Sequence, residues 1–445
     1  MSRFAPYRDV LRLAWPLALG MINNAVMQTV DRIYLSHESQ AALEAVLPAG
    51  VLAGVFVCFF LSLVGYTGTF VAQYHGAGDR DRVAASYRAG RLLALAAGAL
   101  TLLLLPLGGG VLRSVFANPS VAALGEVYYG VSMAGGVFLF GQMAAASYFT
   151  GIGRTRIVFA VNVIGNLLNI AIDPFLIFGW CGLPRLGIAG AAGATVFAQA
   201  VQWAVLAGAV RRDLGRRRPC SRGALWGLVG RILRFGAPSG AYSALNLLSF
   251  AIFVFVTAGV GDVALAASNA SFTVNYLLIA PMEGFALGAA TLVGQAQGRG
   301  DSAAAAAAGR RTLLLALGFV AALSLGAVVF HRPILSLFAP SDPAAAAEFH
   351  ALGFTLFVLM AAWQLFDAAD VVLSGALKGA GDTKFVMWWM LLIAFGLWLP
   401  LVFAVRAARG TMPELWGTMI VYVVVLCVGT GVRWMRGKWK NIRLV

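Results

Sequence analysis

Long apolar runs recur along this 445-residue chain and constrain its fold more than any other feature. The runs have about 20 or more residues, which is enough for a helix to cross a hydrocarbon core of about 30 Å. Lipid offers no partner for backbone N–H and C=O groups, so a spanning segment must be a helix or a strand of a closed barrel. Barrel strands have about ten residues of alternating polarity, whereas these runs are longer and do not alternate. The sequence therefore predicts an all-α polytopic membrane protein.

Twelve of these runs qualify as transmembrane helices, and the composition agrees with so many spans. Hydrophobic residues make up 60% of the chain and charged residues only 11%, whereas soluble domains carry roughly 25% charged residues. The first run is too long for a cleavable signal and lacks a small-residue cleavage site, so we interpret it as a retained span. The expected spans are approximately 8–35, 44–75, 89–114, 121–149, 157–180, 186–210, 228–258, 264–297, 309–336, 344–376, 384–406 and 412–434.

The basic residues are distributed unevenly between the two sides that these spans define. The formal net charge is +15, which on its own would also suit a nucleic-acid-binding protein. With the N-terminus in the cytoplasm, however, all but six of the 33 Lys and Arg residues fall on the cytoplasmic side. This positive-inside pattern predicts a multi-pass protein of the bacterial inner membrane, with both termini cytoplasmic and no nucleic-acid partner. The six exceptions are Arg32, Arg113, Arg185, Arg332, Arg406 and Arg409.

Two parts of the chain repeat each other. Residues 70–79 align with residues 292–301 at an offset of 222, and Pro16 meets Pro238 at the same offset. Each half would then hold six spans, and an even number gives a parallel repeat. Transporters commonly place the substrate path at the interface between such repeats, although a duplicated unit could also form a passive channel.

The domain boundaries follow from this repeat. The offset grows to 228 where residues 150–155 match residues 378–383, so the second half contains six additional residues. An Arg-rich cytoplasmic connector, expected to contact anionic lipid, separates the halves. The expected organisation is an N-terminal six-helix lobe at 1–210, the connector at 211–234 and a C-terminal six-helix lobe at 235–445.

The sequence lacks motifs for a cofactor, a metal centre or ATP. The four cysteines and four histidines show no ligand spacing. The Gly-rich segments 76–78 and 298–300 lack the P-loop pattern, and we expect them to be tight turns at helix ends. We therefore expect no enzymatic activity and no cofactor, and uphill transport would take its energy from an ion gradient or a partner.

Five of the 18 acidic residues fall inside predicted spans. A carboxylate at the centre of a span costs at least about 2.5–3.5 kcal/mol on insertion scales, so each one needs an explanation. The five are Asp31, Asp173, Glu283, Asp367 and Asp370. Counted from the predicted outer ends of their helices, Asp31 and Asp173 lie at similar depth in the outer half of the membrane.

Polar side chains in the first and fifth spans share one helical face each. Their spacings of three and four residues keep each set on one side at about 100° per residue. Such stripes cannot face lipid, so they face other helices or a wet cavity. Two carboxylates brought together in a low-dielectric pocket either hold a proton near neutral pH or share a cation. The stripes consist of Asn24, Gln28 and Asp31, and of Asn162, Asn166, Asn169 and Asp173.

The repeat provides an internal control for these stripes. In the second half their equivalents are apolar, with the one exception of Asn246, which matches Asn24. The scaffold therefore does not require the polar groups, and their presence in one half favours a functional role. The apolar equivalents are Phe250, Phe253, Met390, Ala394, Leu397 and Leu401.

Structural explanations remain open for several of these residues. Asp31 is near a helix end and could pair with Arg32 in the headgroup region. The Asn stripe could serve as hydrogen-bonded glue between helices. Glu283 follows Pro281 and could bond to backbone groups that the proline frees. Asp367 is equally compatible with a structural and a functional role.

Several short motifs, taken in order, resemble the MATE (multidrug and toxic compound extrusion) exporters, particularly their DinF-like bacterial branch. The resemblance covers essentially the whole chain and depends on the order and spacing of the motifs rather than on any one of them. The motifs are Pro16 fifteen residues before Asp31, the segment 30–34, Leu168-Asn-Ile-Ala-Ile-Asp-Pro174, the turn at 293–300 and Gly375-Ala-Leu-Lys-Gly379.

The resemblance implies two V-shaped lobes around a central cleft and exchange of a drug for H⁺ or Na⁺. In the DinF-like branch the cation site lies in the N-terminal lobe, at positions matched here by Asp31, Asn169 and Asp173, with Thr195 as a fourth. The two acids and Asn169 would act as metal ligands only if the coupling ion is Na⁺. The first helix, bent near Pro16, is thought to move when the site takes up a cation.

The NorM-like branch of the family uses acids of the second lobe instead. Asp367 matches one of them, but the partner acid falls at Asn246 and departs from that pattern. We therefore favour the N-terminal site. Residues expected to line the substrate cleft are Asn24, Gln28, Asn162, Asn166, Asn246, Asp367 and Glu283.

Together these features predict a secondary active antiporter that exports small organic, drug-like solutes, cationic or amphipathic, in exchange for H⁺ or Na⁺. A flippase for a lipid-linked precursor is the main alternative, because the wider superfamily contains such proteins, and it would need buried Arg or Lys in the cleft. A membrane enzyme or a non-transporting scaffold is a third possibility. The expected partners are the solute and the lipid bilayer, and we expect a monomer.

Overall fold

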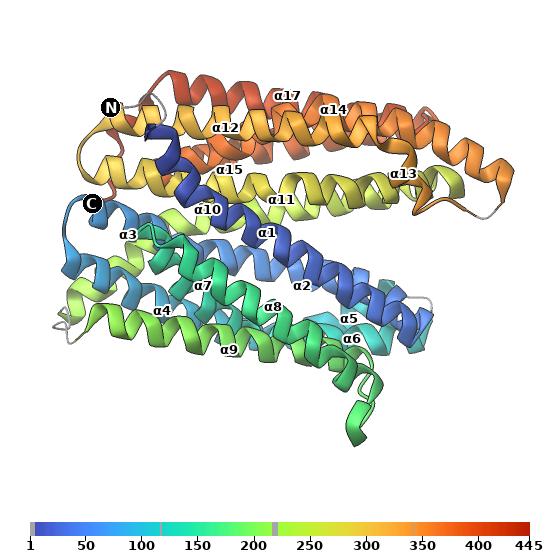
Figure 1. Ribbon diagram of the computed structural model, residues 1–445, viewed down its shortest axis with the longest axis horizontal. Coiled ribbons are helices and arrows are strands. Elements are labelled where there is room, and N and C mark those ends of the chain that lie inside the picture. The colour runs from blue at the N-terminus through green and yellow to red at the C-terminus, as the bar shows by residue number, and fades with distance from the viewer. Residues whose placement is uncertain (1–4, 116–117, 216–220, 341) are drawn as a thin grey trace. The chain divides into compact units, whose positions relative to one another are not determined.

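Helices account for nearly all of the protein, and Figure 1 shows them as two groups of long coils. The computed structural model describes residues 5–115, 118–215, 221–340 and 342–445. Within these ranges the helices are joined by short turns, and no residue lies in a strand. Part of the expected connector, residues 216–220, lies outside the described residues.

The first half begins its helices at polar capping residues. Ser39 Oγ accepts a hydrogen bond from the Ala42 backbone N–H at 3.1 Å, and Asp79 accepts one from the Arg82 backbone N–H at 2.9 Å. Such caps satisfy amide groups that have no partner within the helix. The helices are α1 (Ala5–Glu38), α2 (Gln40–Gly65), α3 (Thr67–Gly76), α4 (Arg80–Leu103), α5 (Leu105–Val115), α6 (Pro119–Ala134), α7 (Gly136–Gly151), α8 (Thr155–Phe178), the 3₁₀ turn η1 (Trp180–Gly182) and α9 (Ile188–Leu214).

Helices of the second half also begin at polar capping residues. Asp342 caps α14 by accepting from the Ala345 backbone N–H at 2.8 Å, and Thr411 with Glu414 forms a capping box at the start of α17. The helices are α10 (Arg222–Thr257), α11 (Asp262–Gly298), α12 (Ser302–Val329), α13 (His331–Ser336), α14 (Pro343–Ala380), α15 (Thr383–Ile393), the π-helical turn η2 (Ala394–Trp398), α16 (Leu399–Ala407), α17 (Met412–Met435) and the 3₁₀ turn η3 (Lys438–Asn441).

The predicted all-α fold with twelve spans is confirmed. Among the described residues, ten spans are long apolar helices, and two more are bent pairs, α4 with α5 at 45° and α6 with α7 at 41°. The sequence predicted single spans at 89–114 and 121–149 and did not show these bends. The first bend lies next to Pro106, whose ring disfavours helical backbone at the preceding residue. The second lies at the pair Gly135 and Gly136, a common cause of kinks.

Equivalent residues of the two repeats cross each other at the ends of α3 and α11. A Cβ atom at Gly76 would overlap the backbone of Gln295, and a Cβ atom at Gly298 would overlap the backbone of Gln73. Gly76 and Gln73 are the repeat equivalents of Gly298 and Gln295, so the contact is reciprocal. Each helix then ends at a glycine-containing turn, as the sequence predicted for segments 76–78 and 298–300.

Contacts divide the chain into two compact units. One contains residues 1–18, 248–293 and 302–443, and the other contains 19–247, 294–301 and 444–445. The second unit has a core of buried aromatic and aliphatic side chains that includes Phe70, Phe140 and Phe149. The lobe boundaries expected from the sequence stay a prediction. The two carboxylates of the predicted cation site, Asp31 on α1 and Asp173 on α8, both lie in the second unit.

Candidate cation site

The site takes its two acids from helices far apart in the sequence. Asp31 lies two turns before the end of α1 and is half-buried, and Asp173 lies near the end of α8 and is fully buried. The two carboxyl groups are close enough to share a hydrogen bond when one of them carries a proton. The pairing of the two acids inferred from the sequence is therefore present in the structure.

Asn169 connects the first acid to a third helix. With its amide oriented to satisfy both polar atoms, Nδ2 donates to Asp31 Oδ1 at 3.1 Å and Oδ1 accepts from the Thr195 backbone N–H at 3.2 Å. Thr195 lies on α9, which packs along α8, and its hydroxyl group donates to the Ala191 carbonyl at 3.1 Å. Asn169 is fully buried. The structure thus brings together the four residues expected to bind the cation.

Asp173 is the least satisfied member of the group. Neither of its carboxylate oxygens accepts a hydrogen bond from an N–H or O–H group in the described part of the chain. A buried carboxylate without donors is costly unless it is protonated or paired with a cation. Its neighbour Asp31 is an acid too, so one proton or one Na⁺ shared between the two carboxyl groups satisfies this arrangement.

The chemistry of the ligands narrows the choice of cation. Two carboxylates, an amide and a hydroxyl group are hard oxygen donors that suit Na⁺ or a proton. Among the described residues, no cluster contains three or more His, Cys, Asp or Glu side chains, the pattern expected of a transition-metal site.

The remaining polar residues of α8 bond to neighbouring helices. Asn166 Oδ1 accepts from Gln202 Nε2 at 3.4 Å, and Asn162 Oδ1 accepts from Gln142 Nε2 at 3.2 Å. The Asn162 backbone carbonyl accepts from Asn23 Nδ2 at 3.5 Å. These contacts have the geometry of hydrogen bonds that hold neighbouring helices together, which is the structural alternative for the Asn stripe. Of the two other stripe residues on α1, Asn24 is exposed and Gln28 is half-buried.

The partner glutamines Gln142 and Gln202 were not among the residues expected from the sequence, although the spacing of Gln202 is a signal. Gln202 follows Thr195 by seven residues on α9, which places both on the same helical face. A polar pair at that spacing in an apolar span has the same form as the stripes on α1 and α8. No residue three, four or seven positions from Gln142 is polar, so this glutamine shows no comparable periodicity.

The equivalent positions of the second half form an aromatic cluster. Phe253, the equivalent of Asp31, is fully buried and stacks on Trp398 with ring centroids 5.3 Å apart. Phe250, the equivalent of Gln28, packs edge-on against Phe272 at 5.1 Å. The same helical scaffold therefore holds an apolar core where the first half holds an acid pair.

The acids of the second half have other surroundings. Asp370 is buried and accepts a hydrogen bond from the Thr430 hydroxyl at 2.8 Å. Lys378 is near enough to Glu283 and Asp370 to interact with both electrostatically. Asp367 is half-buried and the Glu283 side chain is exposed. Asn246 is half-buried and belongs to the unit that contains the acid pair.

Up to twelve apolar spans among the described residues, an internal repeat and an acid pair with a fully buried Asp173 define a multi-pass membrane protein of the ion-coupled transporter class. The chain belongs to the MatE family. The MatE profile matches it twice, over residues 16–175 and 238–404, which together make up more than half of the chain. The two matches begin at Pro16 and Pro238, the same pair that marks the internal repeat.

Bacterial relatives match this chain over most of their length. The chain is 29% identical over 395 residues to a probable multidrug resistance protein NorM of Bradyrhizobium diazoefficiens, a match that covers 88% of this chain and 84% of that protein. It is 26% identical over 406 residues to the multidrug resistance protein MdtK of Cronobacter sakazakii, covering 87% and 86%. Membership of this family places the chain among transporters rather than enzymes.

Solved structures share the fold. The eukaryotic MATE transporter AtDTX14 superposes with a TM-score of 0.87 at 17% identity, covering 98% of this chain and 97% of that chain. A MATE protein crystallised in complex with MaL6 gives a TM-score of 0.85 at 21% identity, covering 97% and 96%.

Proposed function

We propose that this protein is a secondary active antiporter that exports small organic solutes, cationic or amphipathic, in exchange for H⁺ or Na⁺. The observation that carries the proposal is the contact between Asp31 and Asp173, with the Asp173 oxygens buried and lacking donors. The names of the NorM and MdtK relatives support drug-like solutes and favour export over the flippase alternative.

The acid pair supplies a coupling step of useful size. One elementary charge crossing a potential of 100 mV yields about 2.3 kcal/mol. By the relation of about 1.4 kcal/mol per tenfold change, this supports a gradient of roughly fifty-fold for a neutral solute per ion. A monovalent cationic solute exchanged one for one moves no net charge, so its export draws on the concentration gradient of the coupling ion. The ion itself satisfies the carboxyl groups, so the chain needs no cofactor beyond H⁺ or Na⁺. Asp31, Asp173 and Asn169 act as metal ligands in the Na⁺ case, with Thr195 next to them.

Pro16 makes α1 the helix that responds to the cation. A proline within a helix removes one backbone hydrogen bond and allows bending. Residues up to 18 pack with one compact unit and residues from 19 with the other, so α1 changes unit two residues after Pro16. Occupation of Asp31 by a cation alters the charge that α1 must bury, and α1 bends in response.

The organisation expected from the sequence completes the proposal. The positive-inside pattern supports a bacterial inner-membrane location with both termini cytoplasmic. A single chain carries both acids of the site, so the proposal needs no second copy, and the protein works as a monomer. The asymmetry of the repeat supports the DinF-like branch, since Phe253, which stacks on Trp398, and Leu401 stand where the first half has Asp31 and Asp173. In this view the solute contacts polar groups of the expected substrate path, among them Asn24, Gln28 and Glu283.

The experiment uses purified full-length protein in proteoliposomes, with ethidium as the cationic probe. An imposed H⁺ or Na⁺ gradient is expected to drive ethidium movement, and Asp31→Asn or Asp173→Asn is expected to abolish it. Asp262→Asn, at the exposed start of α11, serves as the matched control and is expected to retain gradient-driven movement. Unimpaired export by Asp31→Asn would reject the mechanism, and loss in Asp367→Asn alone would move the coupling site to the second half.

A further inference from the structure

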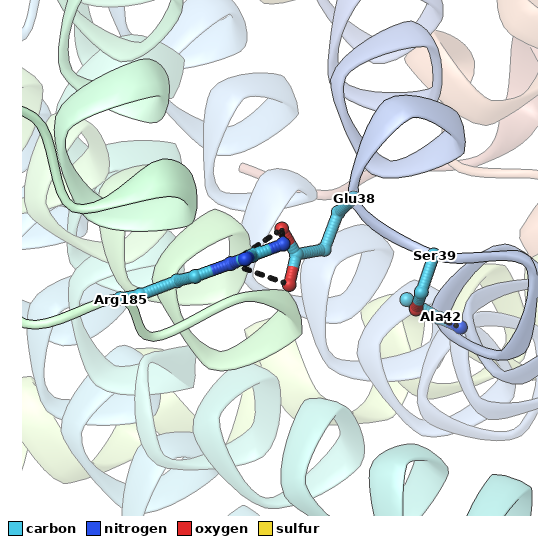
Figure 2. A network of polar contacts seen from close by, with 4 residues as sticks. All are labelled: Glu38, Ser39, Ala42 and Arg185. Atoms are coloured by element: carbon cyan, nitrogen blue, oxygen red, sulfur yellow. Dashed lines mark hydrogen bonds and ion pairs between the residues drawn. The ribbon is translucent and has the colours of Figure 1, made fainter.

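An ion pair connects the last residue of α1 to the loop before α9. Arg185 Nε donates to Glu38 Oε1 and Oε2 at 3.2 and 3.1 Å, and Arg185 Nη2 donates to Oε2 at 2.8 Å. Figure 2 shows the guanidinium group facing the carboxylate in this two-pronged arrangement. The fixed fork of a guanidinium matches a carboxylate in direction as well as in charge, so the pair specifies a geometry. The hydrogen-bonded Glu38 carboxylate raises the pKa of the Arg185 guanidinium.

The loop that carries Arg185 is itself held against the end of α8. The Leu186 backbone N–H donates to the Leu176 carbonyl at 3.0 Å, and the Gly187 backbone N–H donates to the Ile177 carbonyl at 3.2 Å. Gly187 has a φ of 54°, and a Cβ atom there would come within 3.2 Å of Glu38 Oε1. A glycine therefore allows both the backbone conformation and the close approach of the carboxylate.

The same three helices carry the candidate cation site. Glu38 follows Asp31 by seven residues on α1, so the two lie on one face about two turns apart. Leu35 of α1, Ile177 of α8 and Ile188 of α9 are buried in one apolar cluster. Moving back along α1 from its end, the ion pair, this cluster and the acid pair are thus three contacts in turn that join α1 to α8 and α9.

We infer that Glu38 and Arg185 are positioning residues for cation uptake. The inference rests on the proposed function, because it assigns these residues to the same site. The pair and the apolar cluster hold the end of α1 against α8 and α9, which keeps Asp31 next to Asp173 and Asn169. Loss of the pair lowers the fraction of molecules with an assembled site and weakens apparent cation affinity by the same factor. Exposed ion pairs are weak, so the expected effect is about two- to fivefold.

The test measures cation affinity in full-length protein by Na⁺ binding, and by proton uptake in a pH series without Na⁺. Glu38→Arg and Arg185→Glu are each expected to weaken apparent affinity for the coupling cation about two- to fivefold. The maximal rate of ethidium transport at saturating cation is expected to stay near that of the parent protein. The exchanged pair Glu38→Arg with Arg185→Glu is expected to recover most of the lost affinity.

A second ion pair of the same form provides the control. Arg113 on α5 donates to Glu126 on α6 through Nε at 2.6 Å and Nη2 at 3.0 Å, and both residues lie in the same unit as the site. These residues do not belong to α1, α8 or α9, so Arg113→Glu is expected to leave cation affinity unchanged. If Arg185→Glu does not fold, Glu38→Gln tests the positioning role instead. It removes the charge of Glu38 without reversing it and should also weaken cation affinity.

The outcomes separate this inference from the proposed function. Cation binding by the parent protein with unaltered affinity in the Glu38 and Arg185 variants overturns the positioning role alone. An exchanged pair no better than the single variants, or an equal loss in Arg113→Glu, overturns it too. Absence of cation binding in the parent protein overturns both proposals.

Discussion

Asn169 on α8 donates a hydrogen bond to Asp31 on α1 at 3.1 Å, and this contact links the helix that contains Pro16 to the helix that contains Asp173. The amide can donate to a carboxylate but has no charge of its own. It therefore stabilises the ionised form of Asp31 but does not neutralise its charge as a bound cation would. The same hydrogen bond holds Asp31, and with it this part of α1, next to α8.

Replacement of Asn169 by leucine is expected to weaken cation-driven transport. Asp31 loses its donor while it remains in a pocket of low dielectric constant, a cost of about 1–3 kcal/mol for a buried group. Ethidium transport at a fixed gradient should fall about tenfold or more, since about 1.4 kcal/mol corresponds to tenfold. Asn269→Leu, at an exposed position of α11, is the control and should transport normally. Equal rates in both variants would remove Asn169 from the site.

Thr195→Val separates the two candidate coupling ions. Valine has nearly the same shape as threonine but lacks the hydroxyl oxygen, and the backbone N–H that bonds to Asn169 remains. If Na⁺ is coupled and Thr195 ligates it, the half-saturating Na⁺ concentration should rise about tenfold, a change of about 1.4 kcal/mol. If protons are coupled, the pH midpoint of transport should stay near its value in the parent protein.

Thr195→Ser is the control for this substitution because it retains the hydroxyl group. It should behave as the parent protein under both ions. A loss of Na⁺ affinity of equal size in the serine and valine variants would show that side-chain packing, rather than the oxygen, is responsible.

Hydropathy and periodicity were enough to predict the helical fold and the acid pair. A span must be apolar throughout, so the few polar residues on α1 and α8 stand out, and the repeat shows that Phe253 can replace Asp31 in the same scaffold. The ion pair at Glu38 was not predictable in this way. Arg185 reaches it from a loop with positive φ at Gly179 and Cys181, and such backbone conformations leave no signature in apolar spacing.

Pro16→Ala is expected to slow transport while leaving cation binding intact. Alanine restores the backbone donor that proline lacks and favours a straight helix by about 3 kcal/mol in a helix interior. The turnover rate for ethidium should therefore fall about tenfold or more, because bending of α1 now costs a hydrogen bond. Na⁺ or proton affinity should remain within about twofold of the parent value, since no group near Asp31 changes.

Pro48 provides a matched proline within another helix, α2. Pro48→Ala should leave the turnover rate near that of the parent protein. A loss of turnover in Pro48→Ala as large as that in Pro16→Ala would mean that removal of any helical proline slows transport, and α1 would have no special role as the bending helix.

The reciprocal crossing of α3 and α11 should be intolerant of a single methyl group. A Cβ atom at Gly298 would overlap the Gln73 backbone, and backbone atoms cannot rotate away as a flexible side chain can. Overpacking of this kind typically costs about 1–3 kcal/mol. Gly298→Ala should therefore lower the thermal unfolding temperature of the purified protein, and Gly76→Ala should do the same through its contact with Gln295. Gly318→Ala on α12 is the control, because a Cβ atom there meets nothing within 4 Å and alanine favours a helix over glycine by about 1 kcal/mol. An unfolding temperature that stays unchanged in both Gly298→Ala and Gly76→Ala would mean that the two helix ends do not cross at these glycines.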